Sequence, residues 1–160
     1  MFFLKQIADC LLGEDPTSLW LTEFYGDCEL ELAKAALQKA EIYKTVAYVG
    51  DFAMQKLCKK GQEFLILKPD SVEQAVLMSQ EMLKTEIVNL VIIDSLFLLP
   101  NKNMRFEKGL VCLVKAAEEN RKPVFLLNPD NGARKLLQKS LKAFCRHQIQ
   151  IWAAKIDPGV

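Results

Sequence analysis

The sequence predicts an α/β fold, a three-layer sandwich with a mostly parallel sheet of about six strands and helices on both faces. Strand-like and helix-like segments alternate along the chain, as they do where helices connect parallel strands. The stretch Val88–Asp94 is almost wholly apolar, which is typical of a strand buried on both faces. At 160 residues the length suits one domain, so we expect a lead-in over 1–18 and a core over 19–154.

The first two strands are short apolar runs that end in glycine. Leu19–Tyr25 is followed by Gly26, and Thr45–Val49 is followed by Gly50. Between them, Glu29–Tyr43 carries leucine and alanine at helical spacing, which predicts a helix.

The middle of the chain continues the alternation. Asp51 is placed to cap a helix that runs to Lys59, and Glu63–Leu67 reads as the third strand. Ser71 is a predicted N-cap of the next helix, with Gln74 completing a capping box. The buried face of that helix should hold Ala75, Met78 and Met82, and the central strand Val88–Asp94 follows.

The last third predicts two further helix–strand units. Phe106–Asn120 has apolar residues along one side and precedes the strand Pro123–Leu127. A turn at Asn128–Gly132 leads into a helix over Ala133–Phe144. Gln148–Ala153 alternates with period two and closes the sheet.

Composition excludes several classes of protein. Net charge is +1, so bulk charge indicates no preference for nucleic acid. One histidine and scattered cysteines argue against a zinc site, and we expect neither metal nor cofactor. The early charge and short apolar runs argue against a signal peptide or a membrane span, so we expect a cytoplasmic protein, or a nuclear one in a eukaryote. The thiols are expected to be reduced and buried: Cys10, Cys28, Cys58, Cys112 and Cys145.

Several segments, in collinear order, resemble the core of the RecA recombinases. The most specific are Lys68–Ala75, similar to the family's QPDTGEQAL, and Val91–Leu96, similar to its VIVVDSVAAL Walker B strand. The others are Glu23–Gly26, Val46–Ala53, Val124–Asn128 and Asn131–Lys135. The resemblance implies the strand order 3-2-4-5-1-6 and places Asp94 and Ser95 where the family holds magnesium and orients water.

The chain departs from this family where nucleotide and DNA would bind. After Gly26 it has no Gly-Lys-Thr loop, and Asp27, Glu29 and Glu31 stand there instead, which would repel phosphate. The loops that bind DNA in the family are cut to Asn101–Arg105 and Pro129–Asn131. We therefore expect no ATP hydrolysis and no filament of the family's kind.

The catalytic candidates each have a competing structural interpretation, which we favour. Asp94 and Ser95 would be a strand end whose carboxylate neighbouring N–H or hydroxyl groups satisfy. Asp51, near the family's catalytic glutamate, would cap a helix. Asp27, Glu29 and Glu31 would complement a helix dipole. His147 is expected at the surface or at a strand edge, without a catalytic role.

A basic group is the best lead to a nucleic acid or an acidic partner, against the alternative of an ordinary solvated surface. Its members are Lys102, Arg105, Arg134, Lys135, Lys139, Lys142 and Arg146. Lys135, Lys139 and Lys142 share one helical stripe, opposite Leu137, Leu141 and Phe144. A group of large apolar residues is expected in the core, with exposure as a partner patch the alternative for the first three: Phe97, Leu98, Leu99, Trp20 and Trp152.

The resemblance and its departures together imply a non-catalytic accessory or regulatory factor in DNA recombination, repair or the DNA-damage response. Its expected partner is a recombinase, a polymerase or a RecA-like paralogue, with DNA as a further candidate, in a homo- or hetero-oligomer. Two alternatives stay open: a cell-division inhibitor similar to SulA, and a residual NTPase subunit that a partner completes in trans.

Overall fold

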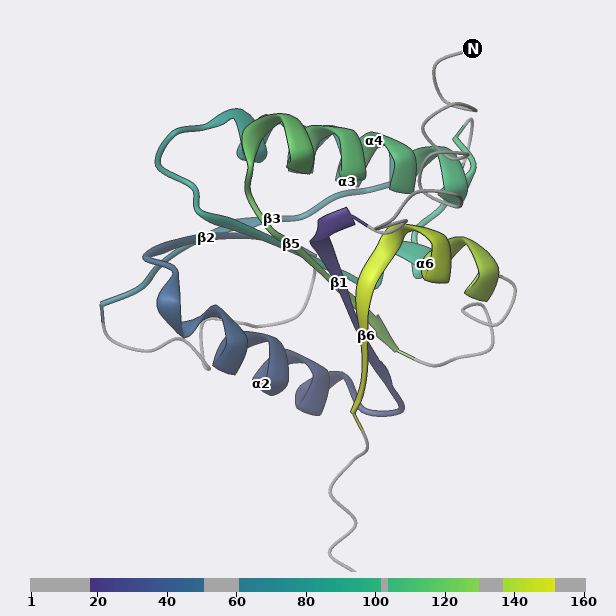
Figure 1. The fold of residues 1–160 in the computed structure, drawn as a ribbon, viewed down its shortest axis with the longest axis horizontal. Helices are drawn as coiled ribbons and strands as arrows, with labels where there is room; N and C mark the ends of the chain where they lie inside the picture. The colour runs from purple at the N-terminus through teal and green to yellow at the C-terminus, as the bar shows by residue number, and fades with distance from the viewer. Residues whose placement is uncertain (1–17, 51–60, 102–103, 130–136, 152–160) are drawn as a thin grey trace, which may run out of the picture.

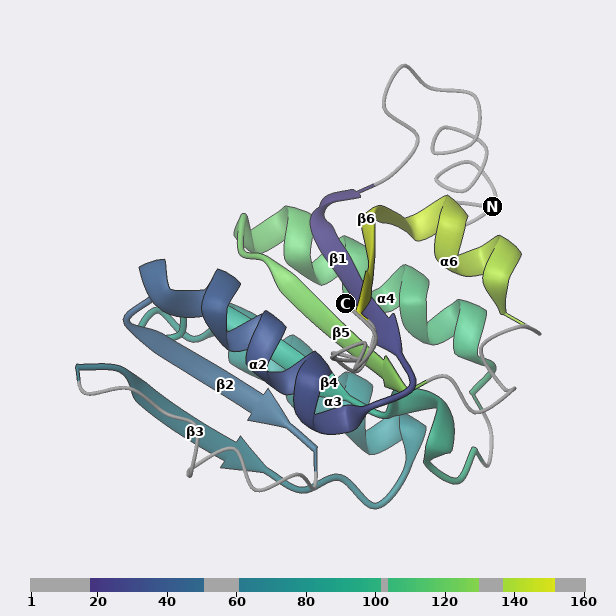
Figure 2. The ribbon, with the colours of Figure 1, turned by 90° about the horizontal axis from the view of Figure 1, so that it is seen from below.

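The computed structural model describes residues 18–50, 61–101, 104–129 and 137–151. They form a parallel sheet between two layers of helices (Figure 1). One helix, α2, lies against one face of the sheet, and α3, α4 and α6 lie against the other (Figures 1 and 2). The predicted three-layer α/β class is confirmed.

The strands of the sheet follow the order β3-β2-β4-β5-β1-β6, and all neighbouring pairs are parallel. This is the strand order that the resemblance to the RecA core implied. The bounds are β1 (Ser18–Gly26), β2 (Thr45–Val49), β3 (Glu63–Leu67), β4 (Leu90–Asp94), β5 (Val124–Pro129) and β6 (Cys145–Ile151). β2 and β3 match the prediction. β6 begins three residues earlier than predicted, because Cys145 pairs with Ser18 directly after α6 ends.

The helices in the described ranges are α2 (Glu29–Lys39), α3 (Val72–Lys84), α4 (Phe106–Asn120) and α6 (Gln138–Phe144), with 3₁₀ turns η1 (Ala40–Ile42) and η3 (Leu96–Leu98). α4 has the predicted bounds. α2 ends four residues before the predicted Tyr43, because its last turn tightens into η1. The predicted helix over 51–59 and the first residues of the predicted helix over 133–144 lie outside the described residues.

The predicted cap of α3 is confirmed. Ser71 Oγ accepts a hydrogen bond from the Gln74 backbone N–H at 3.1 Å. Gln74 Oε1 accepts from the N–H of Asp70 at 2.5 Å, one residue before the cap. The segment that resembled a RecA motif therefore has a local role in starting a helix.

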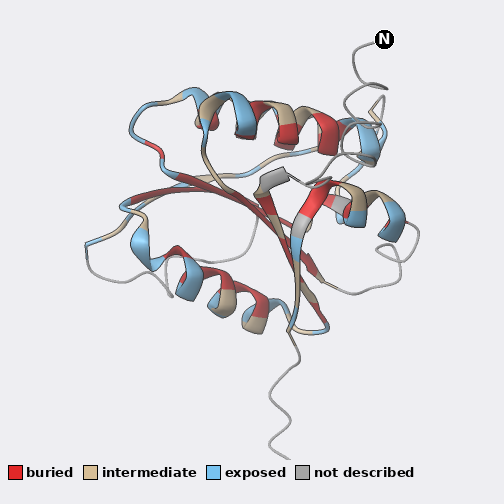
Figure 3. Ribbon diagram, in the orientation of Figure 1, coloured by how far each residue is buried: buried red, intermediate tan, exposed pale blue. Residues whose placement is uncertain are grey.

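The sheet separates two hydrophobic cores (Figure 3). Leucine, valine and alanine side chains of α3, α4 and α6 fill one core, and α2 packs on the other, where the Phe24 and Phe125 rings lie 5.2 Å apart. β2 and β4 are buried at every residue because both of their faces are covered. No helix in the described part of the chain is long and apolar enough to cross a bilayer.

Some burial predictions need correction. Leu98 is 50% exposed because it lies in η3, beyond the last buried residue of β4, whereas Leu99 and Trp20 are half-buried against the core. Of the thiols, Cys145 is buried, but Cys28 and Cys112 are only half-buried because each lies at a helix boundary or flank rather than beneath a helix layer. The remaining positions fall outside the described residues or side chains: Cys10, Cys58, Phe97 and Trp152.

Candidate functional site

Asp94 ends β4 at the carboxyl end of the sheet, where parallel α/β sheets commonly bind ligands. Its side chain is 7% exposed. The Tyr48 hydroxyl, on neighbouring β2, donates to Asp94 Oδ2 at 2.5 Å, and the Ser95 hydroxyl donates to Oδ1 at 2.8 Å. Both carboxylate oxygens thus accept hydrogen bonds from within the protein, as the structural interpretation of this strand end predicted.

The backbone after β4 holds the Ser95 hydroxyl in place. Ser95 adopts a left-handed conformation, with φ 57° and ψ 37°, which L-residues rarely adopt. Its N–H donates to the Leu127 carbonyl at 2.8 Å, so β5 fixes this turn. The chain therefore turns sharply into η3 while Ser95 reaches back to Asp94.

Gly50 brings the end of β2 close to the same carboxylate. A Cβ built on Gly50 would lie 2.8 Å from Asp94 Cβ and 3.0 Å from the Tyr48 hydroxyl oxygen. Such contacts are too short for a real side chain. Gly50 is therefore a packing requirement beside Asp94.

The acidic start of α2 faces the same end of the sheet. Glu29 and Glu31 occupy its first turn, and the N-cap residue, Cys28, makes no side-chain capping bond. Burial, and then the charge of nearby Asp94, raise the pKa of Glu29. The carboxylates are thus close enough to repel each other, and they would also repel a phosphate group.

Gly26, at the end of β1, would open the phosphate loop in a RecA-like ATPase. Here a Cβ on Gly26 would lie 1.8 Å from the carbonyl oxygen of Ile151 on β6. The two residues face each other in the parallel register. Gly26 is therefore explained by the close approach of β6, without a phosphate.

A buried polar network crosses three neighbouring strands. Glu23 on β1 is fully buried and accepts hydrogen bonds from Asn128 Nδ2 on β5 at 2.6 Å and from Gln148 Nε2 on β6 at 3.0 Å. Asn128 Oδ1 is buried without a hydrogen-bond partner among the described residues. The sequence analysis missed this network, although a glutamate inside an apolar run was a usable signal.

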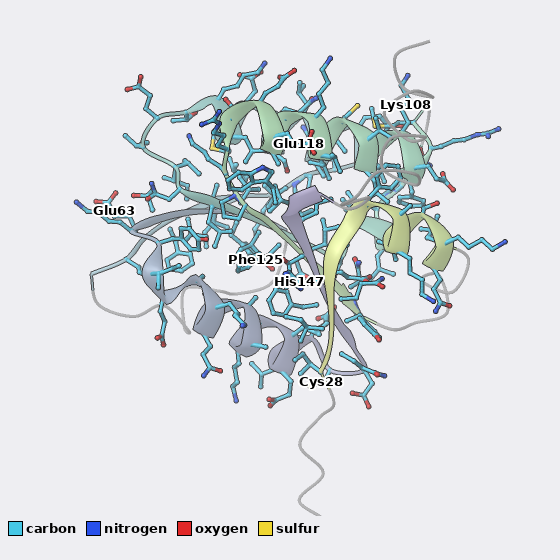
Figure 4. The ribbon with its side chains drawn as sticks, viewed as in Figure 1. Cys28, Glu63, Lys108, Glu118, Phe125 and His147 are labelled. Atoms are coloured by element: carbon cyan, nitrogen blue, oxygen red, sulfur yellow. The ribbon has the colours of Figure 1, made fainter. Side chains whose placement is uncertain are left out.

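The described members of the basic group lie on or beside α4 and α6, which cover the same face of the sheet. Arg105 precedes α4, Lys139 and Lys142 lie on α6, and all three are exposed. α4 begins after the carboxyl end of β4, and α6 ends where β6 begins beside the start of β1 (Figures 1 and 2). Lys108, which the sequence analysis did not single out, extends from the same end of α4 (Figure 4).

The opposite face of α6 is apolar, as predicted. Leu137, Leu141 and Phe144 are buried. The other candidates of the basic group lie outside the described residues or side chains: Lys102, Arg134, Lys135 and Arg146. Asp51 also lies outside the described residues.

The remaining polar candidates show no catalytic constellation. His147 is exposed on β6, an outer strand of the sheet, as expected (Figure 4). Within the four described ranges, no three histidine, cysteine or carboxylate side chains are grouped to hold a metal ion.

Comparison with known proteins adds no identity: no model of a known protein family matches this chain, and no curated protein matches it. A functional assignment therefore rests on the fold and on the geometry of its two ends.

Proposed function

We propose that this protein is a non-catalytic binding protein on a RecA-like sheet, an accessory or regulatory factor in DNA recombination, repair or the DNA-damage response. The observation that carries the proposal is the state of Asp94. At the strand end where a RecA-like ATPase would hold magnesium, hydroxyl groups of Tyr48 and Ser95 engage both carboxylate oxygens.

Three features of the carboxyl end disfavour nucleotide hydrolysis. Asp94 is 93% buried, and its carboxylate accepts hydrogen bonds from within the protein. A metal ion would have to displace these bonds, which costs free energy that binding at an open site does not require. Gly26 is placed for contact with β6 rather than for a phosphate. The acidic first turn of α2 puts negative charge where the phosphates would lie.

Binding through a surface is what the remaining features favour. Arg105, Lys139 and Lys142 place exposed positive charge on the face of the sheet that α4 and α6 cover, and such charge suits a phosphate backbone or an acidic protein segment. The buried side of α6 fixes these cations on a rigid element. Leu98, half-exposed in η3, adds an apolar contact after the carboxyl end of β4.

Nucleotide binding is the direct test of the non-catalytic part. We expect no hydrolysis of ATP in the presence of Mg²⁺, and we expect any ATP binding seen by calorimetry to be unchanged in Asp94→Asn. Micromolar affinity, with turnover abolished in Asp94→Ala, would refute the proposal. Turnover that appears only after a recombinase is added would instead establish an active site completed in trans.

Partner binding is tested by reversing charge on α6. We expect Lys139→Glu with Lys142→Glu to weaken binding to single-stranded DNA or to a recombinase, and to lower the salt dependence by about one unit of slope per lost phosphate contact. The matched control is Lys34→Glu with Lys39→Glu, which makes the same charge change on α2, across the sheet. Equal loss in both pairs, or no loss in the first, would contradict a site on α6.

A further inference from the structure

A second candidate site lies at the amino end of the sheet, the end opposite Asp94. A pocket of about 510 Å³ is lined mainly by residues of the connections that lead into β2, β4 and β5. These connections lie at the left in Figure 1. This volume is in the range of small-molecule sites. Its lining residues are Trp20, Ile42, Tyr43, Lys44, Asn89, Asn120, Arg121, Lys122 and Pro123.

The floor of this pocket is preformed by strand pairing. Thr45 and Asn89 exchange two hydrogen bonds, from Thr45 N to Asn89 Oδ1 at 3.0 Å and from Asn89 N to Thr45 O at 2.9 Å. The Val91 N–H donates to the Pro123 carbonyl at 3.2 Å. Trp20 precedes the paired residues of β1 and β5, which places it beside Pro123. A ligand would therefore meet a site that needs little ordering.

The charge of the lining has one sign. Among the described residues that line the pocket, the charged side chains are those of Lys44, Arg121 and Lys122, all of them cations. Lys122 Nζ already donates to the Thr85 carbonyl at 2.7 Å, at the end of α3. The side chains of Lys44 and Arg121 are in exposed residues and make no hydrogen bond or ion pair within the described part of the structure. Two cations thus remain available to an anion.

Arg121 occupies a backbone position that favours glycine. It caps α4 in the left-handed region, with φ 52° and ψ 50°, where helices most often end in glycine. An arginine there gives up conformational stability that a glycine would supply. This backbone position places an exposed arginine in the lining of the pocket, where its guanidinium group can meet an anion.

The remaining lining groups can recognise a planar ring. Trp20 and Tyr43 are half-buried aromatic residues of the pocket lining. The side-chain oxygen of Asn89 accepts a hydrogen bond from Thr45 N, so its side-chain N–H groups can donate to a ligand. Asn120 donates to the Ala116 carbonyl at 2.7 Å, which leaves its side-chain oxygen. The pocket thus offers aromatic surface, a donor, an acceptor and two cations.

We propose that this pocket binds a nucleoside phosphate, whose base packs on the aromatic walls and whose phosphate pairs with Lys44 and Arg121. The source is either a free nucleotide or a nucleotide within single-stranded nucleic acid. The inference is independent of the proposed function, because the lining of the pocket includes none of Arg105, Lys139 and Lys142.

Trp20 supplies a local readout. In a Trp152→Phe background it is the only tryptophan, since the chain has two. We expect adenosine monophosphate to quench its fluorescence saturably and inorganic phosphate to bind more weakly without quenching. A short single-stranded oligonucleotide that binds more tightly than the mononucleotide identifies the strand as the source, and equal affinity identifies the free nucleotide.

Arg121→Gly separates binding from folding. Because glycine suits the left-handed cap, this variant should keep or raise Tm while its Kd for the nucleotide rises about tenfold or more. Lys44→Gln should weaken binding similarly, and Lys34→Gln on α2 is the matched control that should not. Absence of saturable nucleotide binding at millimolar concentration, equal losses in Arg121→Gly and Lys34→Gln, or equally tight binding of an acidic peptide would overturn the proposal.

Discussion

The hydrogen bond between Tyr48 and Asp94 decides whether the strand end is a closed structural feature or an open site. Tyr48 is fully buried in β2, and its ring packs in the core below the sheet. Tyr48→Phe keeps the ring and removes only the hydroxyl that donates to Asp94 Oδ2 at 2.5 Å. The substitution therefore tests this one interaction with little change in packing.

The expected cost follows from the charge and burial of the acceptor. A hydrogen bond to a charged group contributes about 1.5–3 kcal/mol, and a buried carboxylate that loses a donor cannot recover it from water. We therefore expect the free energy of unfolding to fall by about 2 kcal/mol for Tyr48→Phe. For a domain of this size the change corresponds to a Tm lower by roughly 4–8 °C.

Urea unfolding at pH 7, followed by circular dichroism, gives the change in the free energy of unfolding from the midpoint and the slope of the unfolding transition. A double-mutant cycle with Asp94→Asn then isolates the pair, and we expect a coupling energy of about 1 kcal/mol or more. A loss below about 0.5 kcal/mol, or a cycle without coupling, would refute the reasoning. Asp94 would then be available to a cation, and the non-catalytic proposal would lose its main support.

Three further predictions concern stability. Asn128→Ala removes one amide donor from buried Glu23, so chemical unfolding should show a loss of about 1.5–3 kcal/mol; no loss would mean that the network contributes nothing. Ser71→Ala removes the α3 cap and should cost about 1 kcal/mol, whereas Ser71→Gly should recover most of it. Burial and then the charge of Asp94 raise the pKa of Glu29 above its ordinary 4.5, so the native state binds more protons and its stability falls as pH rises from 4.5 through the folded-state value. Glu29→Gln should therefore have a higher Tm than the natural sequence at pH 7, with the difference shrinking below pH 4.5, and a lower Tm at pH 7 would contradict this sign.

The sheet was predictable because its signals are local. β2, β3 and α4 match their predicted bounds, since each is an apolar run or an amphipathic segment set off by turn residues. The sequence also predicted that groups within the protein would donate hydrogen bonds to the Asp94 carboxylate, because no phosphate loop accompanies this acid. Its main donor, Tyr48, could not be read in advance because that contact depends on the pairing of β2 with β4.

The features that escaped prediction join distant parts of the chain. The Glu23 network links residues more than 100 positions apart, through hydrogen bonds that span 105 and 125 positions. The amino-end pocket combines Trp20 of β1 with residues that precede three other strands, and none of them forms a motif. Leu98 is exposed because it lies in η3, after the buried strand β4 has ended. The hydrophobicity of the residue alone does not indicate that position.

The contact between Gly26 and Ile151 has a consequence for protein engineering. A phosphate-binding loop that puts a side chain at position 26 would need room where the Ile151 carbonyl already stands. Grafting the loop alone should displace β6 and, with it, the Gln148 amide that serves Glu23. Introducing such a loop at the carboxyl end of this sheet therefore requires redesign of an outer strand as well, so the two alterations would have to be introduced as a coupled pair.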